Sequence, residues 1–179
     1  MKTFQDLQEG VYDPNILKAF FLAGGPGSGK SYVVKRGTGG LGLKIVNSDD
    51  VFEKYLKDAG LSMKMPKSEE EPRDKLRDRA KRVTAARQAN YLEGRLGLIV
   101  DGTGKDYDKI AKQATQLKQL GYDVHMIFVN TSLETALQRN AKRDRTVPRS
   151  IATKSWKTVQ SNMGKFSQYF RQNFIVVDN

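Results

Sequence analysis

The chain has 179 residues, of which 38% are hydrophobic and 28% charged, so we expect one soluble domain over 1–179 with a full-sized core. It has no cysteine, which excludes disulfides and cysteine-ligated zinc and favours a reducing cytoplasm, and neither a membrane span nor a secretory signal is visible. The net charge of +11 concerns the partners of the protein rather than its fold.

Five short apolar runs are predicted as strands, at 18–24, 43–47, 96–102, 123–130 and 174–179. Most are near-continuous rather than alternating, as expected of strands buried on both faces. Helical patterns lie between them, and strands that alternate with helices form parallel βαβ units. The sequence therefore predicts an α/β fold with a five-stranded parallel sheet and helices on both sides, in three layers.

The first strand leads directly into a glycine-rich loop, within the segment FFLAGGPGSGKS at 20–31. Glycines let the backbone turn successive N–H groups inward, and these donors form an anion site with the positive end of the next helix. Lys30 can reach the β- and γ-phosphates of ATP, and the Ser31 hydroxyl can hold Mg²⁺. The residues assigned to nucleotide binding by this Walker A pattern are Gly25, Pro26, Gly27, Ser28, Gly29, Lys30 and Ser31.

The glycine-dense stretch 37–42 is expected to form a tight turn that leads from a short helix into the second strand. Two carboxylates follow that strand. Asp49 and Asp50 stand in VNSDDVF, at the sheet edge where ligands bind in open α/β folds. We expect one to face the site and accept a proton from an acceptor hydroxyl, while the other caps the following helix. The alternative that both are helix N-caps stays open.

The segment LSMKMPKSEEEPRDK at 61–75 interrupts the alternation of strands and helices. It is polar and contains Pro66 and Pro72, so it is predicted as an inserted loop before a helix from about Asp74 to Glu93.

The third strand ends in IVDGTG, which places another acid at the same edge of the sheet. Asp101 could order Mg²⁺ through water or contact the acceptor, and Thr103 presents a hydroxyl nearby. The alternative for Asp101 is a turn residue.

A helix face at Ile110, Ala114, Leu117 and Leu120 follows, and Gly121 is expected to end that helix.

The fourth strand contains His125, the only histidine, which is interpreted as a core residue. The segment LETALQRNAKRDRTVPRS at 133–150 follows, and its part 139–150 is predicted as an arginine-rich lid that closes over phosphates and expels water. Arg139, Arg143 and Arg145 would neutralise charge on the transferred group. A solvated helix end is the alternative.

Positive charge is concentrated here, because nine Lys or Arg residues stand against one acid between Thr135 and Arg171. This stretch is either a solvated face or a surface that meets phosphates. The positions Trp156, Val159, Met163, Phe166 and Phe170 repeat at helical spacing, and core packing is favoured over a ligand site.

From about Ala19 to Asn179 the chain resembles the P-loop kinases that include zeta toxins and the 5′-kinase domain of polynucleotide kinases. GGPGSGKS matches their phosphate loop, and SDDVF resembles the zeta-type D-x-F, which implies Asp50 as the base, although the N-x-D-D form of polynucleotide kinases would allow Asp49. VDGTG resembles E-G-T, with Asp101 in place of the glutamate. RTVP resembles R-x-x-P, so Arg145 and Arg139 take the places of the phosphate-clamping arginines.

The chain departs from the zeta pattern at Glu53, where the group usually has a basic residue, and it is shorter than most zeta toxins. It is also similar to small zeta-like proteins of large tailed phages, some of whose relatives phosphorylate hydroxymethylated pyrimidines in DNA. The resemblance implies an ATP- and Mg²⁺-dependent kinase, in the host cytoplasm if a phage encodes it.

The acceptor favoured by the positive charge is a nucleic acid, either a DNA 5′ end or a hydroxymethylpyrimidine, or else a nucleotide. Affinity for such a polymer should fall steeply with salt. The alternatives are a zeta-like kinase of a UDP-sugar, an ATPase switch that transfers nothing, and a non-catalytic nucleic-acid-binding module. No membrane is expected as a partner, and the sequence leaves open whether the protein has a protein partner.

Overall fold

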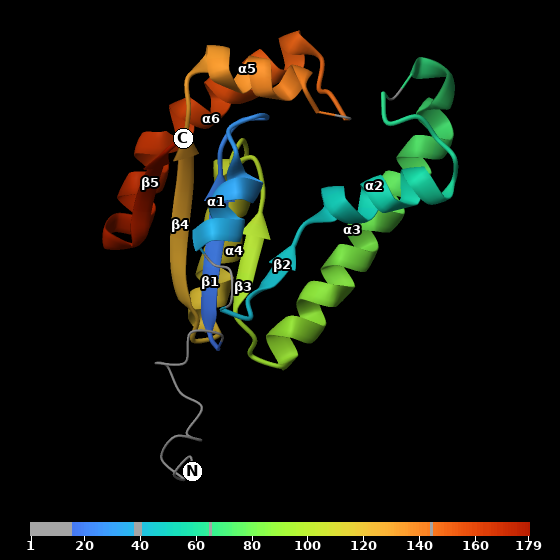
Figure 1. Ribbon diagram of the computed structural model, residues 1–179. Coiled ribbons are helices and arrows are strands. Elements are labelled where there is room, and N and C mark those ends of the chain that lie inside the picture. The colour runs from blue at the N-terminus through green and yellow to red at the C-terminus, as the bar shows by residue number, and fades with distance from the viewer. Residues whose placement is uncertain (1–15, 38–40, 65, 144) are drawn as a thin grey trace, which may run out of the picture.

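The computed structural model describes residues 16–37, 41–64, 66–143 and 145–179. Five parallel strands form one sheet in the order β2-β3-β1-β4-β5 (Figure 1), which confirms the predicted α/β class. The predictions for the N-terminal stretch and for most of the return over 37–42 lie outside the described residues. The strands are β1 Lys18–Ala23, β2 Lys44–Val46, β3 Leu98–Asp101, β4 Asp123–Asn130 and β5 Phe174–Asp178.

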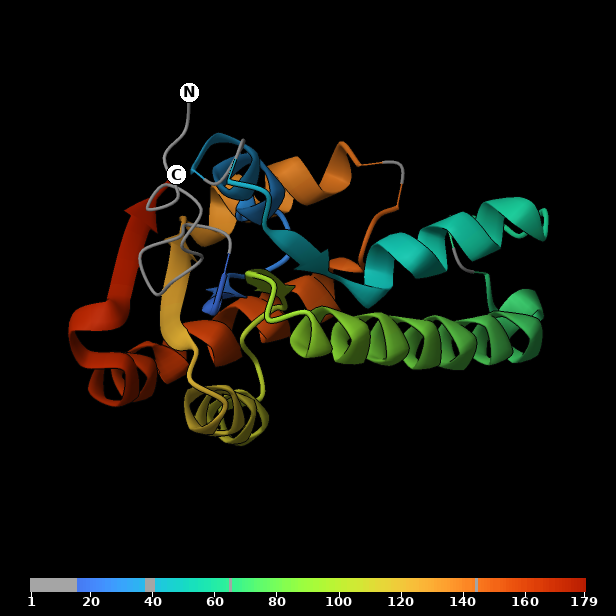
Figure 2. The same ribbon diagram turned by 90° about the horizontal axis from the view of Figure 1, so that it is seen from below.

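Helices cover both faces of this sheet (Figure 2). Helices α4 and α6 lie on one face and α1 on the other, while α2 and α3 form an arm beyond the β2 edge. The helices are α1 Lys30–Gly37, α2 Ser48–Asp58, α3 Glu70–Glu93, α4 Tyr107–Gln119, α5 Leu133–Ala141 and α6 Arg149–Phe170, with 3₁₀ turns η2 Lys67–Glu69 and η3 Arg171–Asn173.

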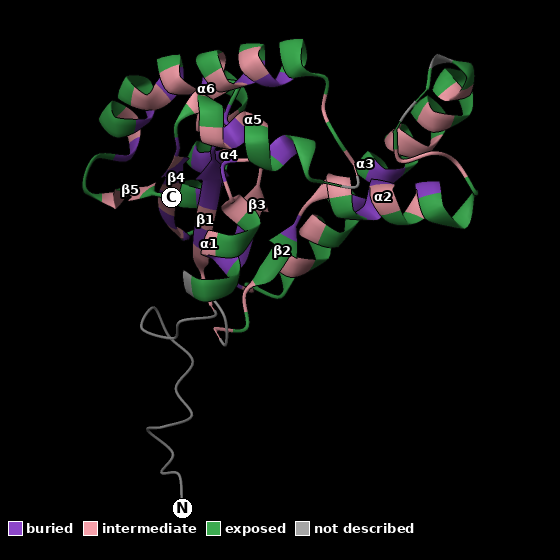
Figure 3. Cartoon of the chain, turned by 45° about the horizontal axis from the view of Figure 1, so that its top comes forward, coloured by how far each residue is buried: buried purple, intermediate pink, exposed green. Residues whose placement is uncertain are grey.

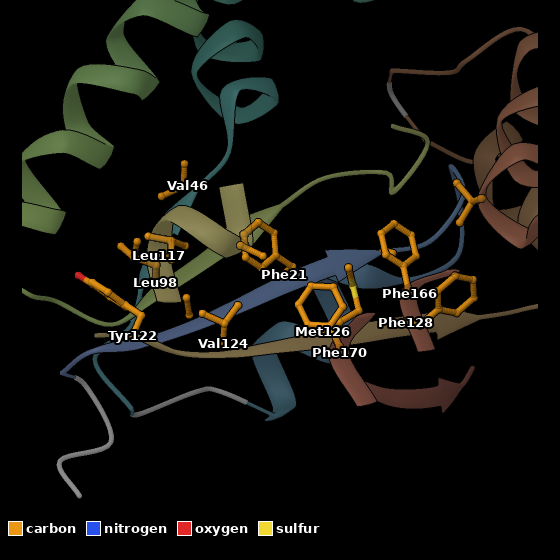
Figure 4. Close-up of a cluster of buried hydrophobic side chains, with 14 residues drawn as sticks. Phe21, Val46, Leu98, Leu117, Tyr122, Val124, Met126, Phe128, Phe166 and Phe170 are labelled. Carbon is orange, nitrogen blue, oxygen red and sulfur yellow. The ribbon is translucent and has the colours of Figure 1, made fainter. Parts of the chain in front are cut away.

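The larger core lies between the sheet and helices α4 and α6 (Figure 4). Phe21 of β1 and Met126 of β4 are buried there against Phe166 and Phe170 of α6. Each buried phenylalanine contributes about 1.5–3 kcal/mol to folding. Val159 is buried in the same cluster and Met163 packs against it, so the stripe on α6 packs the core as predicted from Val159 onward, whereas Trp156 lies outside this cluster.

A smaller core lies on the opposite face, because neighbouring strand residues point to opposite sides of a sheet. Leu22 and Ile99 are buried there with Val34 of α1. Buried residues are concentrated in the central strands, whereas the outer faces of the helices are exposed (Figure 3). The two cores fix the central strands and leave their carboxyl ends free to carry the site.

The segment predicted as a loop over 61–75 is shorter in the structure. Helix α3 begins at Glu70 rather than near Asp74, after the 3₁₀ turn η2. Pro72 falls in the first helical turn, where a missing N–H costs no hydrogen bond, so it does not delay the helix. His125 lies in β4 as expected, but it is only partly buried, stacked on Phe20 at 5.1 Å.

Candidate active site

The glycine-rich loop joins β1 to α1, and its glycines are required by close contacts. Gly27 has φ +82° and Gly29 has φ +91°, a region that residues with a side chain rarely adopt. A Cβ at Gly27 would collide with the carbonyl oxygen of Ala136, and one at Gly29 with the Asn179 amide. The loop is therefore held in one shape, with its backbone close to α5 and to the end of β5.

Lys30 begins α1 and turns its ammonium back over the loop. Its Nζ donates to the carbonyl oxygen of Gly24 at 2.8 Å and to that of Gly25 at 3.3 Å. Burial lowers the pKa of Lys30, and the nearby Asp101 carboxylate opposes that shift. Beneath the loop, the Ser28 Oγ is buried and has no hydrogen-bond partner among the described residues.

Three polar side chains meet where β2 and β3 end. Asn47 donates from Nδ2 to Asp101 Oδ2 at 2.9 Å and to Asp50 Oδ1 at 3.1 Å. The Asn47 amide therefore holds the carboxylate of Asp50, in α2, close to that of Asp101, at the end of β3. Asn47 was not predicted as a site residue, although an asparagine directly before a helix is a recognisable capping signal.

The structure corrects the assignment of the helix cap. Asn47 is the N-cap of α2, and its Oδ1 accepts from the Asp49 backbone N–H at 2.8 Å. Asp49 and Asp50 both lie in the first helical turn, so neither of them caps the helix. Acids there are favoured by the helix dipole, and their side chains remain available for other partners.

The two acids nearest Asn47 both have raised pKa values. Loss of contact with water raises the pKa of Asp50, and the negative charges of Glu53 and Asp49 raise it further, against Arg145. Burial is also the main cause of the raised pKa of Asp101, which Lys30 opposes. Carboxyl groups tuned in this way are common where protons are transferred.

Arg145 connects the predicted lid to α2. Its Nη2 lies 3.2 Å from Asp49 Oδ2, and its Nε lies 3.0 Å from Glu53 Oε1. The side chain of Arg145 is only 11% exposed, whereas that of Glu53 is 30% and that of Asp49 50% exposed, so the pair with Glu53 is the better shielded from water. Arg77 of α3 approaches Asp49 as well, at 3.9 Å. Asp49 is therefore engaged by cations, whereas Asp50 faces Asn47.

The start of the lid is fixed by a buried asparagine that the sequence analysis did not single out. Asn140 donates to the Val147 carbonyl at 2.7 Å and accepts from the Val147 N–H at 3.2 Å. This pair closes the loop between α5 and α6. The backbone of the loop that carries Arg143 and Arg145 is therefore fixed by this pair.

Arg139 contacts the end of β5. Its Nη1 donates to the Asn179 carbonyl oxygen at 3.4 Å, and Asn179 Nδ2 donates to the Ser28 carbonyl at 2.9 Å. Asn179 was not predicted as a site residue, because only the sheet order brings β5 beside the loop. Trp156 also supports the loop, since it lies against Gly25 and donates from Nε1 to the Thr131 carbonyl at 2.9 Å.

One cavity of about 510 Å³ collects most of the predicted residues. Gly25 and Ser28 do not line it and lie buried behind the loop. The lining residues are Pro26, Gly27, Gly29, Lys30, Ser31, Asn47, Asp49, Asp50, Glu53, Asp101, Gly102, Thr103, Arg139, Arg143, Arg145 and Val147.

This cavity suits a nucleoside triphosphate with Mg²⁺. The loop packs against Ala136 and Asn179 without room for a Cβ at Gly27 or Gly29, and one lysine and three arginines line the cavity in front of it. Ser31 and Asp101 offer the hard oxygen atoms that Mg²⁺ prefers, and phosphates and water usually complete its shell. Among the residues that the structure describes, no group of three or more His, Cys, Asp or Glu side chains could hold a metal ion.

Within 16–37, 41–64, 66–143 and 145–179, no helix combines the length and the apolar character needed to cross a bilayer.

No curated protein sequence matches the chain.

Solved structures share the fold at low sequence identity. A chain of the AvrRxo1-ORF1:AvrRxo1-ORF2 complex with sulphate ions superposes with a TM-score of 0.70 at 15% identity, over 90% of this chain and 54% of that one. The PezAT toxin–antitoxin system of Streptococcus pneumoniae gives 0.68 at 17% identity, over 90% and 68%. The Pnkp1/Rnl/Hen1 RNA repair complex gives 0.64 at 22% identity, over 84% and 46%.

This chain thus spans about half the length of the AvrRxo1 chain that it matches. A family model described as Zeta toxin matches residues 8–179, which is nearly the whole sequence. It follows that the chain belongs to the zeta toxin family and has the fold of P-loop kinases.

Proposed function

We propose that the protein is an ATP-dependent kinase that transfers the γ-phosphoryl group to a hydroxyl of a nucleotide or nucleic acid. The observation that carries this proposal is the 510 Å³ cavity, which places the glycine-rich loop, four carboxylates, Asp50 and Asp101 among them, and three arginines around one space. Phosphoryl transfer is catalysed mainly by positioning and by neutralising charge, and these residues supply both.

In the proposed reaction the acceptor oxygen attacks the γ-phosphorus in line with the bond to the β,γ-bridging oxygen. That bond breaks, its electron pair leaves on ADP, and the hydroxyl proton passes to Asp50. Lys30 and the arginines Arg139, Arg143 and Arg145 stabilise the charge that spreads over the phosphoryl oxygens. Ser31 and Asp101 would hold Mg²⁺, which neutralises the β- and γ-phosphates when bound.

Asp50 is a better candidate for the base than Asp49. Asp49 pairs with Arg145 and approaches Arg77, so its oxygens are already engaged by cations. Asp50 has a raised pKa and lines the cavity beside Asn47 and Asp101. A base with a raised pKa accepts a proton more readily near neutral pH. Asp49 is assigned to positioning of the substrate, by holding Arg145 of the lid, and Thr103 is assigned to contact with the acceptor.

The favoured acceptor is a nucleic acid, at a DNA 5′ end or a hydroxymethylpyrimidine. The net charge of +11 supports this choice, as does the likeness to a chain of an RNA repair complex. A UDP-sugar acceptor is the second candidate, and it is supported by membership of the zeta toxin family. We place the reaction in the cytoplasm.

The test is transfer of label from ATP, labelled at the γ-phosphate, with Mg²⁺. The acceptors are single-stranded DNA, duplex DNA with and without hydroxymethylpyrimidines, RNA and UDP-N-acetylglucosamine. Label in one nucleic acid, lost in Lys30→Ala and Asp50→Asn, would support the proposal. Release of phosphate alone, unchanged in Asp50→Asn, would replace the kinase with an ATPase switch.

Two surface substitutions serve as matched controls. Lys112→Ala and Asp108→Asn change exposed residues of α4, which do not line the 510 Å³ cavity. Both variants should retain the label transfer of the unchanged protein. Binding of nucleic acid that persists in Lys30→Ala, with no transfer in any variant, would favour a non-catalytic binding module.

A further inference from the structure

A second cavity, of about 670 Å³, lies along α1 on the face of the sheet opposite the larger core. Its walls come from β1, β2, β3 and α1. The lining residues are Leu22, Ser31, Val34, Lys35, Gly42, Leu43, Ile45, Asn47, Asp50, Ile99 and Asp101.

The walls are apolar because the sheet face extends beyond the helix that packs on it. Helix α1 has eight residues and packs through Val34 onto Leu22 and Ile99. Farther toward the sheet edge, Ile45 of β2 remains 53% exposed. Apolar side chains that line a hollow beside a polar site are typical of ligand binding.

The two cavities meet at the carboxylates. Ser31, Asn47, Asp50 and Asp101 line both of them. A molecule that occupied the second cavity would therefore have one end at Asp50 and Asp101, beside the space assigned to the γ-phosphate. A hydroxyl at that end would lie close to the phosphoryl group, as transfer requires.

The charges of the two cavities differ. Lys30 and three arginines line the first, whereas Lys35 is the one basic residue among the described residues that line the second. Five aliphatic side chains complete the second cavity. Phosphate groups are thus suited to the first, and an uncharged, mainly apolar group to the second.

We propose that the second cavity binds the acceptor through its nucleobase, with the hydroxyl of the same nucleoside placed at Asp50 and Asp101. The volume of about 670 Å³ lies within the range of about 300–1,000 Å³ of ordinary ligand pockets. This assignment rests on the proposed function for its use in catalysis, but the binding itself is independent of transfer. A base in a duplex would enter only after leaving its stack, so a single strand or a free nucleoside is the preferred acceptor.

The test compares Ile45→Lys with Ile175→Lys. Both residues are exposed isoleucines on edge strands of the same sheet, at 53% and 44%, but only Ile45 lines the cavity. The probes are the four deoxynucleosides, and binding is measured by saturation-transfer NMR with irradiation of the protein methyl groups. At least one nucleoside should bind the unchanged protein and Ile175→Lys, with at least tenfold weaker binding to Ile45→Lys. Affinity for a non-hydrolysable ATP analogue should be equal in all three proteins.

The outcomes separate this inference from the proposed function. Equal nucleoside binding in Ile45→Lys, or no binding of any nucleoside, would overturn the cavity assignment even if label transfer succeeds. Nucleoside binding that depends on Ile45, without transfer to any acceptor, would overturn the kinase and keep the cavity. Circular dichroism checks that each variant folds, and Ile45→Thr, which removes apolar surface without adding charge, replaces Ile45→Lys if it does not.

Discussion

The two sides of the site are built differently. On the phosphate side the loop is in close contact with Ala136 of α5, Trp156 of α6 and Asn179 after β5. On the acceptor side β2 has three residues, and only Ala80 and Thr84 of the 24 residues of α3 are buried. The side that would bind the phosphates of ATP is held in place by its neighbours in the sheet and in α5 and α6. On the acceptor side, α2 and α3 pack mainly against each other, through a separate apolar cluster of Val51, Phe52, Leu56 and Ala80.

Arg145 is one of the few links between the two sides. It reaches from the lid to Asp49 and Glu53 of α2. Arg77, whose guanidinium lies 4.3 Å from the centre of the Phe52 ring, connects α3 to the same helix. Closure of the lid on ATP would therefore shift α2, the helix that carries the proposed base Asp50.

The largest expected effect is loss of the base on the acceptor side. Asp50→Asn should lower kcat by about 10²–10⁴-fold, because general base catalysis is worth that much. Binding of ATP should stay within about twofold, since the loop is unchanged. A time course of label transfer measures kcat, and equilibrium binding measures the affinity for ATP. Asp49→Asn is the paired variant, and a greater loss in it than in Asp50→Asn would reverse the assignment.

The next effect concerns the rigidity of the phosphate side. Gly27→Ala should weaken ATP binding at least tenfold, since the added Cβ meets the Ala136 carbonyl and the φ of +82° is unfavourable. Isothermal titration with a non-hydrolysable analogue measures it.

Gly121→Ala is the matched control for that substitution. Gly121 has φ +88° and nothing within 4 Å of an added Cβ, so it separates backbone strain from collision. It should cost about 1–2 kcal/mol of unfolding free energy and leave ATP affinity unchanged. Equal ATP affinity in Gly27→Ala would show that the loop tolerates movement.

A smaller effect tests the link between the sides. In a double-mutant cycle of Arg145→Gln and Glu53→Gln, the coupling in unfolding free energy should be about 1–3 kcal/mol, because the pair is largely shielded from water. Urea unfolding measures it. The exposed pair of Lys75 and Glu71, at 2.7 Å, serves as the comparison and should give about 0.3–0.5 kcal/mol. Equal couplings would mean that Arg145 does not hold α2.

The smallest effect is on pH dependence. A carboxylate base is active when deprotonated, so the rate falls as pH drops through its pKa. Desolvation raises the pKa of Asp50, and the Glu53 charge adds to it. Glu53→Gln should therefore move the acid limb of the profile of kcat/KM to lower pH. A limb that stays in place or moves to higher pH would show that another group titrates.

The fold was largely predictable because its signals are local. The five apolar runs became the five strands, and the glycine loop followed the first of them. The early start of α3 at Glu70 was missed because Pro72 was interpreted as a helix breaker, whereas the first turn tolerates proline.

The candidate site was predictable where a residue is recognised from its neighbours in sequence. Asp101 ends β3, Lys30 and Asp50 lie in the first turn of the helix that follows a strand, and the structure brings all three to one cavity. Asn179 and the pairing of Arg145 with Glu53 could not be found, since these contacts join residues far apart in the chain. The second cavity was hidden for a similar reason, because it depends on how far α1 covers the sheet.

The strand order has a consequence for how such a protein could diversify. Strands β1, β4 and β5 with α5 and α6 supply the phosphate side, whereas β2, α2 and α3 form one continuous piece of chain. That piece joins the sheet at its margin, and within the described part of the chain β2 pairs with β3 alone, over Lys44–Val46. Recombination could therefore exchange it as a cassette, and a lineage could acquire new substrates while inheriting the phosphate machinery intact.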